Sequence, residues 1–308
     1  MRISTQSQIS MIKNSVADNM ATINKMNEQF NSGKRVDVPS DDPIASTLFL
    51  QVESENLKIE QHGKNLNSVK SNIELQEANI ESVDNLLDSI KKTLIQLAPT
   101  TNSPDDIKSF VQSIESKMDS LVTMLNKKNM EGRYLYSGTD TSTKPVEFDA
   151  TLNQYVYHGN ESIRENIVGD GVTEKDTVLL HQVFSVGNDK MKVLSDLKEL
   201  CTTLKTGPVT PTTPADIQNM LKSVEGAANQ LDSISGDLIN RKENLAILQT
   251  AQKQIKDSNI KFGQNLVGME ITERYMLFMQ MEQYRNAIKG TMQTHAKMSQ
   301  LSIFNYMS

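Results

Sequence analysis

Apolar residues recur between positions 43 and 97 at alternating steps of three and four, without a slip over the whole stretch. The positions of this heptad stripe are Ala45, Leu48, Val52, Glu55, Ile59, His62, Leu66, Val69, Ile73, Gln76, Ile80, Val83, Leu87, Ile90, Leu94 and Leu97. A helix over residues 43–97 would be about 80 Å long at a rise of about 1.5 Å per residue. So strict a repeat requires continuous packing against other helices. The sequence therefore predicts a mainly α, elongated fold: a long antiparallel helical bundle or coiled coil with a small β-rich inserted outer domain.

The two ends of the chain carry shorter stripes of the same spacing. The N-terminal stripe consists of Ile9, Ile12, Val16, Asn19, Ile23, Met26 and Phe30, and the C-terminal stripe of Met281, Tyr284, Ile288, Thr291, His295 and Met298, continuing to Leu301. The residues around the first stripe are mostly Asn, Gln, Ser and Thr, which are weak helix formers. Because such a helix needs a partner, we expect the two chain ends to lie together.

Two Ser/Asp clusters predict the starts of helices. Residues 40–43 read Ser-Asp-Asp-Pro and residues 103–106 read Ser-Pro-Asp-Asp, which supplies a cap, acidic charge and a first-turn proline. Paired aspartates could also bind a metal or act as acid and base. No third carboxylate or His follows at ligand spacing, so capping is favoured. The apolar residues from Ile107 to Leu125 then predict a helix that returns antiparallel to the first long one.

From about Gly132 to residue 188 the pattern changes to short β-prone runs separated by Gly, Asn and Asp. The predicted strands are residues 134–136, 146–148, 155–158 and 177–180. Helical spacing resumes with an amphipathic segment at 193–204, and residues 207–214 predict a loop rich in Gly, Pro and Thr. A second long stripe follows from Ile217 to Met269, with one shift of register at Leu248.

Composition excludes several classes of function. The formal net charge is −6 and no basic block exceeds a pair of lysines, so we expect no nucleic-acid partner. No apolar stretch approaches the ~18–20 residues that cross a bilayer, so we expect no membrane insertion. Cys201 lies in a helical pattern amid Leu and Thr, which favours a packed side chain over a nucleophile. His158 and His181 lack partners at metal spacing. We therefore assign no catalytic, cofactor-binding or metal-ligating residue.

Residues 32–45 read Ser-Gly-Lys-Arg-Val-Asp-Val-Pro-Ser-Asp-Asp-Pro-Ile-Ala, and this segment resembles the flagellin superfamily. In that superfamily a Ser-Gly-basic segment followed by Asp-Asp joins the terminal helix to the first core helix. The Pro-Ser-Asp-Asp-Pro form resembles the hook–filament junction branch, since flagellin proper has Ala-Ala after the Asp pair. Residues 1–6, 132–139 and 301–304 are similar to the start, the border of the insertion and the ending of the same branch.

The resemblance implies a discontinuous domain plan. Residues 1–40 and 265–308 would form a terminal coiled-coil polymerisation domain, 41–132 and 189–264 a helical core domain, and 133–188 a β-rich outer domain. The implied subunit interface consists of Ile9, Ile12, Val16, Ile23, Met26, Phe30, Met281, Tyr284, Ile288, Met298 and Leu301. The implied connector motif consists of Gly33, Arg35, Pro39, Asp41, Asp42 and Pro43.

The resemblance also implies a role and partners. It predicts a non-enzymatic structural subunit that joins hook-associated proteins at the hook to the flagellin filament, with copies of itself in a ring layer. It implies export by the flagellar type III apparatus without a cleaved signal peptide, an extracellular location, and a cytosolic chaperone that binds Leu301, Ile303 and Phe304. A divergent flagellin and a coiled-coil type III secreted protein remain the alternatives.

Overall fold

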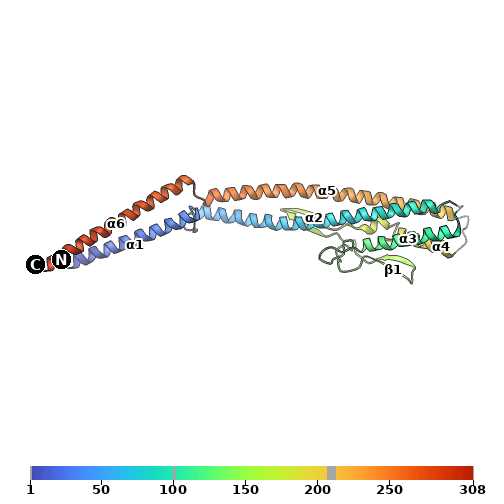
Figure 1. The fold of residues 1–308 in the computed structure, drawn as a ribbon, viewed down its shortest axis with the longest axis horizontal. Helices are drawn as coiled ribbons and strands as arrows, with labels where there is room; N and C mark the ends of the chain where they lie inside the picture. The colour runs from blue at the N-terminus through green and yellow to red at the C-terminus, as the bar shows by residue number, and fades with distance from the viewer. Residues whose placement is uncertain (1, 100–101, 207–212, 308) are drawn as a thin grey trace. The chain divides into compact units, whose positions relative to one another are not determined.

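The computed structural model describes residues 2–99, 102–206 and 213–307, with side chains described for 7–99, 102–206 and 214–297. The chain divides into two compact units. We call Met1–Lys58 with Gln254–Ser308 the terminal unit, and Ile59–Lys253 the central unit. The helices of the described ranges are α1 (Arg2–Ser32), α2 (Pro43–Leu97), α3 (Pro104–Leu125), α4 (Lys192–Thr206), α5 (Thr213–Val267) and α6 (Ile271–Met307), as labelled in Figure 1.

The helix predicted at residues 43–97 is confirmed, since α2 has those bounds. Its start follows from Asp42, whose Oδ1 accepts a hydrogen bond of 3.0 Å from the backbone N–H of Ala45, while Pro43 occupies the first helical position. The cluster at residues 103–106 caps α3 in the same way. Ser103 Oγ accepts from Asp106 N, and Asp106 Oδ2 accepts from Ser103 N, each at 3.2 Å, which completes a capping box.

The core of the molecule lies in the central unit. The stripe of α2 is buried there at Leu66, Val69, Ile73, Gln76, Ile80, Val83, Leu87, Ile90, Leu94 and Leu97. Facing side chains of α3, α4 and α5 belong to the same cluster. Ion pairs between Lys242 and Glu77 (2.5 Å) and between Lys91 and Glu225 (2.9 Å) flank the contact of α2 with α5. The antiparallel return predicted from the sequence therefore forms a helical bundle (Figure 1).

Two separate antiparallel hairpins form the β region. Strand β1 (Val146–Asp149) pairs with β2 (Gln154–Tyr157), with Val146 opposite Tyr157. Strand β3 (Glu165–Gly169) pairs with β4 (Val172–Lys175) through a tight Asp170–Gly171 turn, where Gly171 has a positive φ of 68°. The first hairpin confirms the strands predicted at 146–148 and 155–158, except that β2 ends at Tyr157.

The other two predicted strands are wrong. Residues 134–136 form bends with one isolated bridge, and residues 177–180 run extended into a 3₁₀ helix, Leu180–Phe184. Their apolar side chains, such as Leu135 and Val178, are buried against the helical core, which explains the β-prone composition without strand pairing. Strands β3 and β4 were not predicted, because their outward-facing Glu, Thr and Lys residues weaken the apolar signal of a strand.

Polar side chains of α2 hold the β region in place. Asn79 donates from Nδ2 to the hydroxyl of Tyr136 at 2.9 Å and to the carbonyl of Met124 at 3.0 Å. Gln76 donates to the carbonyl of Asp176 at 3.0 Å, and the carboxylate of Asp176 is paired with Arg164 at 2.6 Å. Gln76 interrupts the apolar stripe because that position anchors a loop rather than a neighbouring helix.

Helix α4 (Lys192–Thr206) contains the amphipathic segment predicted at 193–204, and α5 runs unbroken through the second long stripe. The predicted loop at 207–214 lies mostly outside the described residues, but α5 already begins at Thr213. Within α4, Cys201 is fully buried, and burial raises the pKa of its thiol to about 12. Cys201 is therefore a packed apolar side chain, as the sequence predicts.

Candidate assembly surface

The terminal unit pairs the two ends of the chain. Helices α1 and α6 lie side by side (Figure 1), as their stripes predict. Ile23 of α1 and both Met281 and Ile288 of α6 are buried in this contact. The other stripe positions are half-buried at Ile12, Val16, Met26, Phe30 and Tyr284, and exposed at Ile9. A pair of helices alone therefore covers only part of each stripe.

An aromatic contact and a charged hydrogen bond join the pair where α1 ends and α6 begins. The rings of Phe30 and Phe278 are 6.2 Å apart between centroids. Arg274 reaches across from α6, donating from Nη2 to the carbonyl of Phe30 at 2.7 Å while its guanidinium carbon lies 5.2 Å from the centre of that ring. A charged donor on the last turn of a helix satisfies a carbonyl that has no partner within the helix.

The connector after α1 is hydrogen-bonded to the turn between α5 and α6. Lys34 and Gly268 form an antiparallel bridge, flanked by Arg35 N to Val267 O at 2.7 Å and Met269 N to Gly33 O at 2.9 Å. Gly33 has a φ of +68°, the left-handed conformation in which helices commonly end. The two breaks in the helical path therefore face each other and are fixed by shared backbone bonds.

Charged side chains hold the connector in its conformation. Arg35 bridges the Asp42 carboxylate at 3.3 Å and the carbonyl of Leu266 at 3.2 Å. Asp41 accepts from Lys25 at 2.6 Å and from the N–H groups of Asp37 and Val38. The Lys25 hydrogen bond is the largest cause that holds the pKa of Asp41 below its ordinary range, and the Ala45 N–H has that effect on the pKa of Asp42. Asp41 therefore stabilises the connector, and Asp42 caps the start of α2.

A small apolar cluster lies beneath this connector. It contains Val36, Ala45 and Val267, with Phe49 and Leu266 packed against them. Gly263 of α5 makes room for the ring of Phe49, since a Cβ at position 263 would lie 3.4 Å from two of its carbons. Of the connector motif, Pro39 is exposed and contributes to the chain path rather than to packing.

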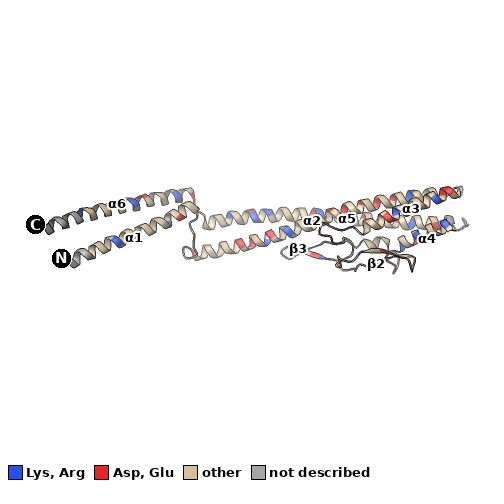
Figure 2. Cartoon of the chain, turned by 60° about the horizontal axis from the view of Figure 1, so that its bottom comes forward, with Lys and Arg blue, Asp and Glu red and all other residues tan. Residues whose placement is uncertain are grey.

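One face of α6 presents apolar side chains to solvent. Ile271, Tyr275, Met276 and Met279 are exposed to 87%, 66%, 57% and 45%, and Phe278 is also exposed. Positions 271, 275 and 278 follow the helical steps of four and three, so these side chains share one face. Figure 2 shows that α1 and α6 carry few charged residues. Contiguous exposed apolar side chains of this kind mark an interaction site.

An open groove of about 330 Å³ runs between α1 and α6 farther along the pair. It is lined by Ile12, Lys13, Val16, Ala17, Met20, Met292 and His295. The groove and the exposed face of α6 together form what we call the assembly surface. Arg274, Tyr275 and Phe278 were not predicted as site residues, although the spacing of the last two with Ile271 could have identified their shared face. The predicted side chains Met298, Leu301, Ile303 and Phe304 lie outside the described residues.

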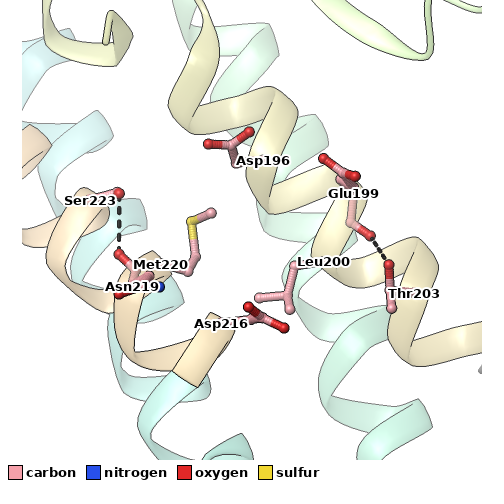
Figure 3. A pocket seen from close by; sticks show the side chains of 8 residues that line it. All are labelled: Asp196, Glu199, Leu200, Thr203, Asp216, Asn219, Met220 and Ser223. Carbon is pink, nitrogen blue, oxygen red and sulfur yellow. Dashed lines mark hydrogen bonds between the residues drawn. The ribbon is translucent and has the colours of Figure 1, made fainter. Parts of the chain in front are cut away.

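A second hollow, of about 340 Å³, lies between α4 and α5 in the central unit and has three carboxylates on its wall (Figure 3). Asp196 is already paired with Lys192 at 2.6 Å, and the remaining acids Glu199 and Asp216 are exposed. Among the described residues, no group of three His, Cys, Asp or Glu side chains is placed to hold a metal ion. Over the same residues, no helix combines the length and apolar character of a membrane span.

Comparisons with known proteins agree with this fold. Residues 3–141 match the bacterial flagellin N-terminal helical region. Flagellar hook-associated protein 3 of Escherichia coli strain K12 is 25% identical over 192 residues, which cover 57% of this chain and 61% of the relative. The chain spans about half to three-fifths of the length of the hook-associated relatives that it matches.

Two solved structures share the fold. A Vibrio parahaemolyticus structure described as a flagellar hook-associated protein superposes with a TM-score of 0.69 at 24% identity, over 74% of this chain and 100% of that one. The flagellar junction protein of Legionella pneumophila superposes with a TM-score of 0.58 at 14% identity, over 72% and 100%. The N-terminal part of the chain is therefore similar in sequence to the flagellin N-terminal helical region, the chain is similar in sequence to flagellar hook-associated protein 3, and it shares the fold of solved flagellar hook-associated proteins.

Proposed function

We propose that this chain is a structural subunit of the bacterial flagellum that joins hook-associated proteins at the hook to the flagellin filament. The observation that carries the proposal is the exposed apolar face of α6 beside a half-covered pair of terminal helices. Burying a Tyr, Phe or Met side chain contributes about 1.5–3 kcal/mol. Neighbouring subunits that cover Ile271, Tyr275 and Phe278 would therefore bind at the terminal unit.

Assembly would also complete the folding of the ends. Ordering a residue costs about 1–2 kcal/mol of backbone entropy, and the α1–α6 pair fully buries few apolar side chains, among them Ile23, Met281 and Ile288. Neighbouring subunits would add the missing apolar contacts along both stripes, including Met298 and Leu301. Polymerisation and firm ordering of the two ends would then be one event.

The resemblance to hook-associated protein 3 supports further parts of this proposal. The partners would be other hook-associated subunits, flagellin and copies of this chain in a ring layer, at an extracellular location. Export would use the flagellar type III apparatus, and a cytosolic chaperone would hold Leu301, Ile303 and Phe304 beforehand. The chain would have no catalytic activity, which agrees with the burial and the raised thiol pKa of Cys201.

The domain plan is part of the proposal. Residues 1–40 with 265–308 would polymerise, 41–132 with 189–264 would form the rigid core, and 133–188 would form the outer domain. Limited proteolysis of the free protein tests this plan. We expect cleavage before about residue 40 and after about residue 265, with a resistant core. Ends as resistant as the core would contradict assembly-driven ordering.

A strain that lacks this gene tests the role itself. Negative-stain images should show hooks without filaments, with flagellin released into the medium, and the full chain supplied in trans should restore filaments. Filaments that attach normally without this chain would contradict the proposal. The number of copies of this chain per flagellum distinguishes a junction subunit from the main alternative, a divergent flagellin. A junction layer contains few subunits, whereas a flagellin would be present in thousands.

A coiled-coil type III secreted protein unconnected with the flagellum is the remaining alternative. It would share the heptad stripes, but nothing in its role would require the connector between Gly33 and Pro43. Fractionation of sheared flagella separates the two possibilities. This chain should remain with the hook end of the flagellum, and its complete absence from purified flagella would favour the alternative.

A further inference from the structure

Methionine is unevenly placed in the molecule. Of the 16 methionines in the chain, four lie on the assembly surface with exposed side chains: Met20, Met276, Met279 and Met292. In the central unit, Met118, Met191 and Met220 are buried in the helical core. Met130 is the exception there, since it is 98% exposed in the turn that follows α3. Thioether groups open to solvent are thus concentrated where the chain would meet its neighbours.

We propose that the exposed methionines of the assembly surface, above all Met276 and Met279, form an oxidation site that switches assembly off. This inference rests on the proposed function, because it assumes that the face of α6 is covered by neighbouring subunits. The oxidant is a peroxide, encountered by the subunit before its incorporation. Conversion of the thioethers to sulfoxides would make the subunit unable to join while leaving its core folded.

The chemistry needs only the side chain and the peroxide. The thioether sulfur attacks one peroxide oxygen, an S–O bond forms as the O–O bond breaks, and hydrogen peroxide leaves as water. Sulfur loses two electrons and the peroxide gains them, giving methionine sulfoxide. A reductase that uses a thiol reverses the step. Reaction depends on access to the sulfur, so Met276 and Met279 should react well before Met118 and Met191.

The consequence for assembly follows from polarity. A thioether is apolar and adapts to irregular contacts, whereas a sulfoxide oxygen is a strong acceptor that must keep a hydrogen-bond partner when it is buried. Met279 follows Tyr275 by four positions and Met276 by three, so it lies beside both of these exposed side chains on α6. A neighbouring subunit that covers this face would remove water from the sulfoxide oxygen. Its own surface would be apolar and would offer that oxygen no hydrogen bond, so binding would weaken.

The test uses the purified full chain and hook–basal bodies isolated from a strain that lacks its gene. The protein is treated with hydrogen peroxide, oxidised sites are mapped by peptide mass spectrometry, and binding is measured by co-sedimentation. We expect early oxidation at the exposed methionines, which are Met11, Met20, Met130, Met276, Met279 and Met292. Thermal unfolding of the core should be unchanged, and binding should fall on the order of tenfold. Treatment with methionine sulfoxide reductase and dithiothreitol should restore binding.

Two variants identify the responsible residues. Met276→Leu with Met279→Leu keeps the apolar face and removes the two sulfurs of α6 nearest to Tyr275, so after peroxide treatment this variant should bind hooks better than oxidised wild type. Met130→Leu removes a more exposed methionine outside the assembly surface and should remain sensitive. Undiminished binding of wild-type protein oxidised at Met276 and Met279 would overturn the inference, as would protection by Met130→Leu. Failure of untreated protein to bind hooks would instead overturn the proposed function.

Discussion

The guanidinium of Arg274 donates a 2.7 Å hydrogen bond to the backbone carbonyl of Phe30, 244 residues away in sequence. This contact ties the first turn of α6 to the last turn of α1, beside the backbone bridge between Lys34 and Gly268. The two ends of the chain therefore meet through polar bonds at the connector, while their remaining contact is an incompletely covered apolar stripe. The proposed assembly depends on this arrangement: α1 and α6 are attached firmly at the connector, and the remaining length of the helix pair is open to neighbouring subunits.

Replacement of Arg274 by Met should loosen α6 from α1. The variant keeps an unbranched side chain against Phe30 but removes a charged hydrogen bond, which contributes about 1.5–3 kcal/mol. Amide hydrogen exchange should become faster in the last turns of α1 and remain unchanged in α3. Arg285→Met is the control, because Arg285 pairs with Glu282 on the surface of the same helix. Equal exchange in both variants would show that the Phe30 contact contributes nothing.

Gly268→Ala should destabilise the connector. A Cβ at position 268 would lie 2.3 Å from the carbonyl oxygen of Gln264, so the backbone must move and the bridge to Lys34 must weaken. We expect a cost of roughly 1–3 kcal/mol, seen as faster exchange at Arg35, whose N–H bonds the carbonyl of Val267.

Gly290→Ala in α6 is the matched control for Gly268→Ala. No atom lies within 4 Å of a Cβ at position 290, so alanine should stabilise the helix by about 0.5–1 kcal/mol. A Gly268→Ala protein with the exchange pattern of wild type would contradict the close approach seen at Gln264.

The central unit should lose stability as the pH falls below about 6.5, the ordinary pKa of His. His181 is buried and stacked on Tyr157 at 4.3 Å between ring centroids. Burial, assisted by the charge of Lys190 and opposed by Glu161, lowers the pKa of His181 in the folded state. The unfolded chain therefore takes up the proton first, and stability declines through the interval between the two pKa values, by at most about 1.4 kcal/mol per pH unit.

Thermal unfolding of His181→Phe between pH 7 and pH 5 checks this expectation. Phenylalanine can stack on Tyr157 without titrating, so the variant should show a smaller decrease in Tm than wild type. His158→Gln is the control for loss of an imidazole from the same β region, since His158 is exposed. A His181→Phe variant with the slope of wild type would show that the buried imidazole is not responsible.

The long helices could be predicted from the sequence because their signal is local and repeated. The bounds of α2 follow from the cap at Asp42 and from a stripe that ends at Leu97, and α3 follows from its capping box. Strands were harder to predict, because an apolar run such as residues 177–180 can be buried without pairing with another strand. The apolar pattern alone does not separate these two cases. The hairpin β3–β4 has outward-facing polar residues, and its position depends on distant side chains such as Asn65, which donates to the carbonyl of Ile167.

The assembly surface could be predicted only in part. The stripes identify Ile23, Met281 and Ile288 as the side chains that α1 and α6 bury against each other. The spacing of a stripe does not show which of its side chains stay exposed once α1 and α6 have packed against each other. Tyr275 and Phe278 were therefore recognised as part of the assembly surface only from their exposure in the structure. Arg274 could not be identified in advance, because its acceptor is a backbone carbonyl near the other end of the chain.

Binding of surface variants to isolated hooks tests the proposed assembly most directly. Tyr275→Asp with Phe278→Asp places charge on the exposed face of α6, and Ile247→Asp places the same charge on an exposed apolar position of α5 in the central unit. Thermal unfolding should show that both proteins remain folded. We expect the α6 variant to lose hook binding by at least about tenfold, since burying an unpaired charge is costly, and Ile247→Asp to bind as wild type does. Equal binding by the α6 variant and wild type would contradict assembly through the terminal helices.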